Sequence, residues 1–523
     1  SITDGRLPSM LTMTLGENVY ADRNLVWFTD KSVTGSQVQI SEGDRSSFNP
    51  LTVDGSCEII EIDMPLMDVG ILATYTSKEI ARHTASMKGL KADTLYTYRV
   101  GDATKGYFSD LYTFRTPITE DKSGFEMLIV TDMQGMTQSN YEDSAKMLQA
   151  SMQVSEKGYD LILNLGDMVD SGKNTNQWQY FLDSGRNLYG TTPQVVVSGN
   201  HDIALEDSKI NTASGRSPLD IHYNISDKKY YSFDYKSVHF VVLDTNDIVN
   251  DNLSFNQIDW LINDLQQNKD NLVVVAMHKG IYSAGPHRND KEIINMRKTL
   301  GKLFSDYKVE LVLQGHDHVY SESFYMDGEG KKTKVPAYNQ GAPINNNSGG
   351  VLYITMGSSG NKYYSFADEN IDYISKGKFF HTPTLQNPTF GRLVFDGENI
   401  KSFAYEYDLE KNQINQLKFF NKNRIALIVS IVTAIIIVIG VGVLIFILVL
   451  NHKKKLAACI KENELENQNI NSKIIIKING GNKDDNLNCT TDNNLNAENF
   501  ENQSNNQLED EANGIDGNQK IDK

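Results

Sequence analysis

The chain of 523 residues is too long for a single domain, and its 39% hydrophobic content is enough for sizeable cores. Its formal net charge of -17 argues against a general nucleic-acid surface, because phosphate backbones need lysine and arginine. Only 3 cysteines are present, and Cys57 is the only one before residue 425, so the presumed globular part can form no internal disulfide.

The first 117 residues contain short β-like runs at close spacing, with little helical pattern between them. These runs cover residues 11–15, 25–29, 37–40, 58–62, 74–77, 83–87, 94–100 and 111–115. Such a texture is typical of a β-sandwich, which we expect over residues 5–117 as a rigid spacer, with residues 116–124 as the linker that follows.

Residues 118–408 have a different pattern of predicted elements. Short runs at 125–131, 161–165, 194–197, 272–276 and 309–313 are nearly all apolar and β-branched, as strands buried on both faces should be. The segments 139–153 and 255–268 have helical patterns. Alternation of strand, turn and helix predicts an α/β domain, whose ligands gather at the carboxyl ends of the strands.

Polar strings stand where these apolar runs end. They are Asp132 with Gln134, Gly166-Asp167, Gly199-Asn200-His201-Asp202, Met277-His278 and Gly315-His316-Asp317-His318. Each string alone would suit an ordinary turn, a helix cap or a solvated loop. Together they supply carboxylates, amides and imidazoles, which hard or borderline divalent ions accept as ligands. Their conjunction predicts a metal centre.

The carboxyl-terminal part has a membrane-like composition. Residues 425–450 are uncharged and almost entirely apolar, beyond the roughly 20 residues that span a hydrocarbon core, so we predict a transmembrane helix behind a juxtamembrane stalk over 409–424. Lys453, Lys454 and Lys455 suit a cytoplasmic stop-transfer cluster, although lysines also flank the other end. We expect a single-pass type I protein whose catalytic domain is extracellular or lumenal, at the plasma membrane, lysosome or vacuole.

Residues 451–523 are rich in Asn, Asp and Glu and poor in aromatic residues, which predicts a disordered cytoplasmic tail. Sequons at Asn224, Asn252 and Asn346 lie in the large domain and predict glycosylation on a secreted face.

The order of the polar strings resembles that of the calcineurin-like metallophosphoesterases, and more narrowly their purple acid phosphatase branch, which has a fibronectin type III-like amino-terminal domain. Trp27 and the segment 90–100, with Tyr96 as a tyrosine corner, carry the likeness to that first domain. The resemblance covers roughly residues 5–408. It implies an α/β domain with two mixed β-sheets flanked by helices.

The resemblance also implies the ligands of two divalent metal ions, drawn from Zn, Fe, Mn or Mg. A first ion would be held by Asp132, Asp167 and His318, and a second by Asp167, Asn200, His278 and His316. Asp167 would bridge two cations about 3.5 to 4 Å apart, and a hydroxide bound to them would be the nucleophile.

Substrate-side roles follow from the same resemblance. His201, next to a ligand, is placed to hydrogen-bond a phosphoryl oxygen or to protonate the leaving group. His287 resembles a second substrate-side histidine. Arg288 is a rival for that role, because a guanidinium binds phosphate bidentately.

Two positions depart from the family pattern. Asp170 stands where purple members have the tyrosine that binds ferric iron, so we predict a colourless protein. Gln134 stands where many metallophosphoesterases have a histidine ligand. Gln134 is expected to bind a metal weakly, to support its ligands or only to position water, and Asp170 is expected to bind a metal or to support its ligands.

The expected function is a membrane-anchored, acid phosphatase-like hydrolase of phosphomonoesters. Its partners would be a phosphorylated small molecule or phosphoprotein and, through residues 425–450, a lipid bilayer. A phosphodiesterase or nucleotide hydrolase with the same metal core is one alternative. The other is a non-catalytic surface adhesion module.

Overall fold

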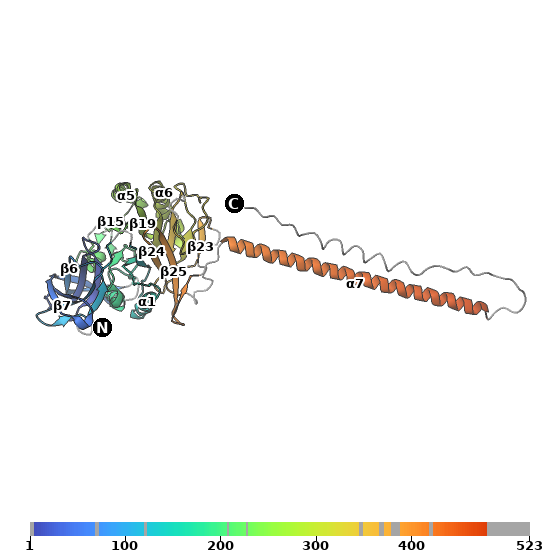
Figure 1. Cartoon of the computed structure of the whole chain (residues 1–523), viewed down its shortest axis with the longest axis horizontal. Coiled ribbons are helices and arrows are strands. Elements are labelled where there is room, and N and C mark those ends of the chain that lie inside the picture. Colours follow the sequence, from blue (N-terminus) through green and yellow to red (C-terminus); the bar gives the residue numbers. More distant parts are fainter. Residues whose placement is uncertain are drawn as a thin grey trace, which may run out of the picture. The chain divides into compact units, whose positions relative to one another are not determined.

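The computed structural model describes residues 5–67, 73–119, 123–206, 209–225, 229–344, 349–365, 371–377, 387–417 and 422–478 (Figure 1). It divides into two units, Ser1–Val429 and Ser430–Lys523. The first unit contains all of the candidate ligands, and the second contains most of one long apolar helix.

The amino-terminal part is the β-rich domain that the sequence predicts. Its strands are β1 (Ser9–Leu15), β2 (Arg23–Asp30), β3 (Gln37–Glu42), β4 (Leu51–Asp54), β5 (Ser56–Met67), β6 (Thr74–Met87), β7 (Leu95–Asp102), β8 (Tyr107–Phe108) and β9 (Tyr112–Arg115). Two predicted runs are a single long strand, β6, which pairs with both β2 and β5. Trp27, Val38 and Tyr98 are fully buried in the core between the two sheets of this domain.

One sheet of this domain continues into the α/β part. Strand β1 pairs in parallel with β12 (Gln194–Val196), with Thr14 opposite Gln194. The result is a 10-stranded sheet in the order β26-β25-β24-β10-β11-β12-β1-β2-β6-β5. The spacer predicted for residues 5–117 is therefore paired edge to edge with the next domain, a relation that no local pattern of residues encodes.

The α/β part has two mixed sheets, as predicted. The first contains parallel β10 (Phe125–Val130), β11 (Leu161–Asn164) and β12, with antiparallel β24 (Thr389–Phe395) and β25 (Ile400–Asp408) beyond them. The second has seven strands in the order β15 (Tyr231–Tyr235), β16 (Val238–Val242), β19 (Leu272–Lys279), β20 (Leu311–Gly315), β22 (Leu352–Met356), β21 (Tyr320–Ser323) and β23 (Ile374–Gly377).

The sheets face each other across an apolar core. Met127, Leu163 and Val195 of the first sheet share this core with Val274 and Leu313 of the second. Helices α1 (Gln138–Ser151) and α2 (Thr175–Ser184) cover the outer face of the first sheet, and α5 (Phe255–Gln267) and α6 (Lys291–Asp306) cover that of the second. Helices 139–153 and 255–268 were predicted within two residues.

Short elements complete the unit. They are η1 (Arg45–Ser47), α3 (Arg186–Tyr189), β13 (Leu205–Glu206), β14 (Lys209–Ile210), α4 (Pro218–Tyr223), β17 (Ile248–Val249), β18 (Asn252–Leu253) and η3 (Pro286–Asn289).

The predicted stalk at 409–424 contains a strand instead. β26 (Gln413–Gln416) pairs with β25 as the outermost strand of the 10-stranded sheet. Its sequence, QINQ, is mostly polar because an edge strand has one side in water, and that polarity suggests a linker when only the sequence is read.

Helix α7 runs from Lys422 to Ile478 and contains a candidate membrane span, Ile435–Ile470. An 18-residue window within this span has mean hydropathy 2.8, and by length and composition the helix could cross a membrane. The disordered tail predicted from residue 451 is thus helical up to Ile478. The stretch beyond 450 contains Leu, Ala, Lys and Glu with neither Gly nor Pro, which favours helix propagation. The rest of the predicted tail, 479–523, lies outside the described residues.

Candidate metal centre

Five of the predicted ligands lie at one edge of the two sheets. Asp132 follows β10 and Asp167 follows β11, while His278 is near the end of β19, and His316 and His318 follow β20. Because these strands run parallel within each sheet, their carboxyl ends bring residues up to 186 positions apart to one place.

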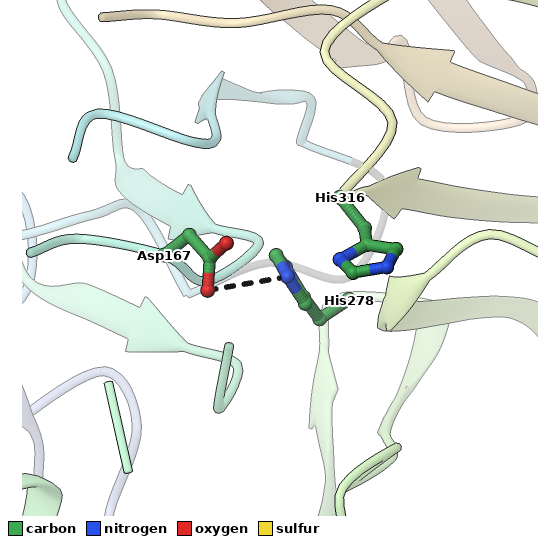
Figure 2. Close-up of side chains that lie close together, drawn as sticks. All are labelled: Asp167, His278 and His316. Atoms are coloured by element: carbon green, nitrogen blue, oxygen red, sulfur yellow. Dashed lines mark ion pairs between the residues drawn. The ribbon is translucent and has the colours of Figure 1, made fainter. Parts of the chain in front are cut away.

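Two sets of side chains could each hold a metal ion. The first ligand group is Asp132, Asp167 and His318, and the second is Asp167, His278 and His316. Within each group the ligand atoms lie within 4.8 Å of one another. Figure 2 shows the second group, with the ion pair between Asp167 and His278. Asp167 belongs to both groups, so its carboxylate can bridge two ions.

The ring of His278 is oriented for a cation. Its Nδ1 donates to the carbonyl oxygen of Leu165 at 2.8 Å, so in the neutral ring Nε2 has a lone pair. That Nε2 lies 3.3 Å from Asp167 Oδ1 and 3.1 Å from Asn200 Oδ1. Three acceptor atoms converge at one buried point, where only a proton or a metal ion can satisfy them. Asn200, predicted as a ligand of the second ion, thus lies within contact distance of His278.

His318 is oriented in the same way. Its Nδ1 donates to the carbonyl oxygen of Lys362 at 2.7 Å, and its Nε2 lies 3.4 Å from Asp132 Oδ1. A ligand histidine whose second nitrogen donates to a carbonyl has its tautomer and ring direction fixed. Both groups therefore fit divalent ions by donor chemistry and by orientation.

The backbone at four ligand positions is unusual. Asp132, Asp167, His316 and His318 have φ values of 52°, 54°, 72° and 49°, in the left-handed region that residues other than glycine rarely adopt. Such conformations cost free energy and cluster at functional sites. Each places a side chain just after its strand ends, back over the sheet edge.

Asp202 ties two of the ligand loops together. Its carboxylate accepts backbone N–H bonds from Gly199 at 2.9 Å, Asp167 at 2.8 Å and Met168 at 2.8 Å. Glycine is required at 199, because an added Cβ would lie 2.0 Å from the nitrogen of Asp167. The loops after β11 and β12 therefore behave as one rigid piece.

Burial sets the protonation of the centre. Desolvation raises the pKa of Asp132 to about 7, whereas for Asp167 the positive charge and hydrogen bond of His278 outweigh desolvation and hold the pKa below its usual range. Desolvation lowers the pKa of His318 to about 4 and also depresses that of His316. His316 and His318 are thus neutral, as metal ligands must be. The pKa of His278 is instead raised to about 9, because the charge and hydrogen bond of Asp167 outweigh desolvation, so His278 must lose a proton when it binds a metal ion.

His201 lies at the edge of the second group. Its backbone N–H donates to Asp167 Oδ1 at 2.8 Å, and its Nδ1 donates to the carbonyl oxygen of Asp170 at 2.7 Å. The Asp170 carboxylate is 3.7 Å from the same Nδ1. Asp170, predicted as a possible ligand, belongs to neither ligand group and instead contacts His201. The ring Nε2 of His201 is the nitrogen left for a substrate.

His287 also joins the centre. Its ring centroid is 4.5 Å from that of His316, and its Nδ1 lies 2.9 Å from Asp290 Oδ2. For its predicted rival, Arg288, the contact in the structure is a backbone one, in which the carbonyl oxygen accepts from Arg297. The ring of His287 therefore lies next to a predicted ligand, and its substrate-side role stays a prediction.

Several residues that the sequence reading did not single out contact these ligands. The carbonyl oxygen of Lys362 orients His318, and the ring centroid of Tyr364 lies 4.5 Å from that of His318, with the rings tilted by 42°. Asn246 donates through Nδ2 to the carbonyl oxygens of Ser198 and Gly199. Asp202 belongs to the polar string at residues 199–202, although no role was predicted for it. The others follow apolar strands without a recognisable signature.

The glycosylation predictions differ in their surroundings. Asn224 is exposed, and its Oδ1 accepts from Arg82 at 3.0 Å. Asn252 is half-buried, and its Nδ2, the atom a glycan would occupy, donates to Thr299 at 2.9 Å. Asn346 lies outside the described residues.

Comparison with known families agrees with this geometry. Residues 125–320 match the calcineurin-like phosphoesterase family, and residues 8–116 match the purple acid phosphatase N-terminal domain. Among solved structures, purple acid phosphatase PPD1 from yellow lupin (Lupinus luteus) seeds superposes with a TM-score of 0.63 at 16% identity, covering 80% of this chain and 75% of that one. This likeness shows a shared fold.

Curated relatives come from Arabidopsis thaliana. Purple acid phosphatase 15 is 26% identical over 351 residues, which are 61% of this chain and 60% of that protein. Probable inactive purple acid phosphatase 1 is 25% identical over 311 residues, which are 55% of this chain and 50% of that protein. The chain thus spans less than two thirds of the length of either relative.

Proposed function

Because this chain belongs to the calcineurin-like metallophosphoesterases and carries the N-terminal domain of the purple acid phosphatases, we propose that it is a membrane-anchored hydrolase of phosphomonoesters. One observation carries the proposal. Two ligand groups share the buried carboxylate of Asp167, as a dinuclear centre requires. When bound, two divalent ions would activate water and neutralise charge on the phosphoryl oxygens.

The protein groups around this centre have distinct tasks. Asp202 holds the loops of Asp167 and Asn200 in fixed register through backbone hydrogen bonds. His201 contributes Nε2, which as an imidazolium donates a proton to the leaving oxygen. His287, oriented by Asp290, binds a phosphoryl oxygen from the opposite side, next to His316.

A cavity lined in part by Asp202, which follows His201 in the chain, is a candidate site for the organic part of a small-molecule substrate. A cavity of ≈ 740 Å³ lies elsewhere, between α1, α2 and α3, but a second cavity of ≈ 570 Å³ begins at Asp202. It is lined by Ala204, Leu205, Lys229 and Tyr230. Its volume falls in the range of small-molecule pockets, and its mixture of apolar, aromatic and charged groups suits an organic leaving group attached to phosphate.

Membrane anchoring is supported by α7. Every side chain from Ile435 to Leu450 is exposed in the structure, and the run contains no charge. An uncharged helical surface of this length is stable in hydrocarbon and unfavourable in water. The lysines at 453–455 suit the cytoplasmic side, which would leave the metal centre outside or in a lumen.

A non-catalytic adhesion module is the second candidate, because one similar protein is named a probable inactive phosphatase. Retention of the ligands argues for catalysis, since a decayed centre loses them. The prediction of a colourless protein with two divalent ions follows from Asp170, because an aspartate gives no tyrosinate absorption.

The test uses the full chain purified in detergent. Elemental analysis should find two transition or alkaline-earth ions per chain, and chelation followed by metal add-back should abolish and restore hydrolysis of para-nitrophenyl phosphate. Asp167→Asn should lose both metal and activity, whereas Glu142→Gln at an exposed position of α1 should lose neither. Faster turnover of the bis ester would reassign the enzyme as a diesterase, and no turnover of either ester by the metal-loaded chain would favour the adhesion module.

A further inference from the structure

The loop after β22 is an additional contributor to the first ligand group. Ser358 Oγ donates to the carbonyl oxygen of Asp132 at 2.9 Å, and the carbonyl oxygen of Lys362 accepts from His318 Nδ1 at 2.7 Å. Residues 358–364 thus contact two of the three ligands of this group. None of the motifs in the sequence pointed to this loop.

The side chain of Lys362 extends to Gln134. When the Gln134 amide is oriented so that both of its ends have a partner, its oxygen lies 3.2 Å from Lys362 Nζ and its nitrogen lies 3.2 Å from Asp167 Oδ2. The Gln134 backbone N–H also donates to the carbonyl oxygen of Asp167, at 3.0 Å. Gln134 is 2% exposed, so its amide cannot exchange these partners for bulk water.

The reverse orientation of the amide is unfavourable without a metal ion. It would set the amide oxygen against the Asp167 carboxylate and the NH₂ group against the Lys362 ammonium, and both pairs are repulsive. A metal ion could relieve the first of these repulsions by accepting the oxygen as a ligand. The second would persist for as long as the ammonium stays in place.

We propose that Lys362 is a positioning residue that keeps Gln134 out of the coordination sphere of the first metal. Only the oxygen of the Gln134 amide can bind a divalent ion, and this oxygen already accepts a hydrogen bond from the Lys362 ammonium. The Gln134 amide nitrogen then donates to Asp167 Oδ2 and so holds the bridging carboxylate in place. This inference rests on the proposed dinuclear centre.

The consequence is an asymmetric pair of sites. The first ion has three protein ligands, whereas the second, with Asn200, has four. Fewer ligands and a nearby ammonium make the first ion the weaker-bound one, and they leave more of its positions for water and substrate. Lys362 thereby determines metal affinity at one site without contacting the metal.

Isothermal titration calorimetry, in which Zn²⁺ is added to the metal-free full chain, tests the proposal. The wild-type chain should bind two ions with different affinities, and His318→Ala should remove the weaker event. Lys362→Met frees the amide oxygen and removes the charge, so the weaker event should tighten about ten-fold, equivalent to about 1.4 kcal/mol. Lys362→Arg keeps a cationic donor and should resemble wild type.

A double-mutant cycle isolates the part that acts through Gln134. In a Gln134→Ala background, Lys362→Met can act only by removing charge, so its effect on the weaker event should shrink at least about five-fold. Equal effects in both backgrounds would overturn the inference while leaving the dinuclear centre intact. Failure of the wild-type chain to bind two ions would instead overturn the proposed function.

Discussion

Oδ2 of Asp202 accepts the backbone N–H of Asp167 at 2.8 Å, across 35 residues of chain and at full burial. The same carboxylate accepts from Gly199 and Met168, so it faces donors alone. An acid that binds only N–H groups cannot be replaced by an amide of the same shape, because the NH₂ half would face another donor.

We therefore expect Asp202→Asn to cost about 1 to 3 kcal/mol of stability and to reduce bound metal below two ions per chain. Urea unfolding and elemental analysis measure these two effects. Asp259→Asn, on the exposed face of α5, is the control and should change neither. Full metal occupancy in Asp202→Asn would show that the loops hold their register without this carboxylate.

His201 can be tested by the quality of the leaving group. If its Nε2 protonates the leaving oxygen, His201→Gln should reduce kcat about 10²-fold or more for phenyl phosphate, which has a poor leaving group, and much less for para-nitrophenyl phosphate. Its Nδ1 contact with the Asp170 carbonyl makes glutamine a reasonable steric match. Equal losses for both esters would assign His201 to binding alone.

Gly199 is the most confined glycine of the centre. An added methyl group would lie 2.0 Å from the nitrogen of Asp167 and 2.3 Å from its Oδ1, so Gly199→Ala should displace the bridging carboxylate and abolish metal binding. Gly280→Ala is a matched control, because its methyl group would find its nearest atom at 3.4 Å. Calorimetric titration of both variants with zinc shows whether metal binding is lost only where the added methyl group clashes, or after any glycine-to-alanine change near the centre.

His222 predicts how stability depends on pH. Desolvation, with a smaller contribution from Arg82, lowers its pKa to about 3, and its ring stacks on Trp178 at 4.4 Å. Below the ordinary pKa of 6.5 the unfolded chain binds a proton that the folded chain does not, so stability falls as pH decreases. One such histidine changes the free energy of unfolding by up to about 1.4 kcal/mol per pH unit.

His222→Phe keeps the aromatic stack and removes this proton. The stability difference between wild type and variant, measured by urea unfolding at pH 7, 6, 5 and 4, should therefore shift in favour of the variant as the pH decreases. Parallel stability curves would mean that the histidine is protonated in the folded chain as readily as in the unfolded one.

Arg82 joins the sandwich to the α/β part. Its guanidinium is 2% exposed and donates to the carbonyl oxygens of Ile221 and Asp220 at 2.7 and 2.9 Å, and to Asn224 and Glu58. Arg82→Met should cost about 2 to 3 kcal/mol, because buried acceptors lose their donor.

Arg115→Met removes an exposed pair with Asp93 and should cost less than about 1 kcal/mol. Thermal unfolding of the two variants gives the comparison. Similar losses would mean that other contacts hold the junction.

Most features that depend on neighbouring residues in the chain, such as single strands and helices, were predicted from the sequence. Strands such as β10 and β19 are continuous apolar runs, and the polar residues at their ends mark the centre because parallel strands share one edge. The side chains that cluster in the two groups are among those that the resemblance implied as ligands, and their binding of metal stays a prediction.

The sequence could not predict contacts between residues that are far apart in the chain and become neighbours only in the folded protein. Lys362 is brought to Gln134 across more than 200 positions, and neither residue carries a pattern that names the other. The pairing of β1 with β12 joins strands that are 179 residues or more apart, and neither strand carries a pattern that names the other. The positive φ angles at Asp132 and His318 are likewise a product of the packed loops.

The pairing of β1 with β12 has a consequence for access to the metal ions. Two domains that share a sheet have no hinge between them, so the sandwich cannot swing aside like a lid to admit a bulky molecule. Access to Asp167 then depends on the short loops around it. Under the proposed function, selection among phosphate esters would be a matter of fixed shape rather than of domain closure.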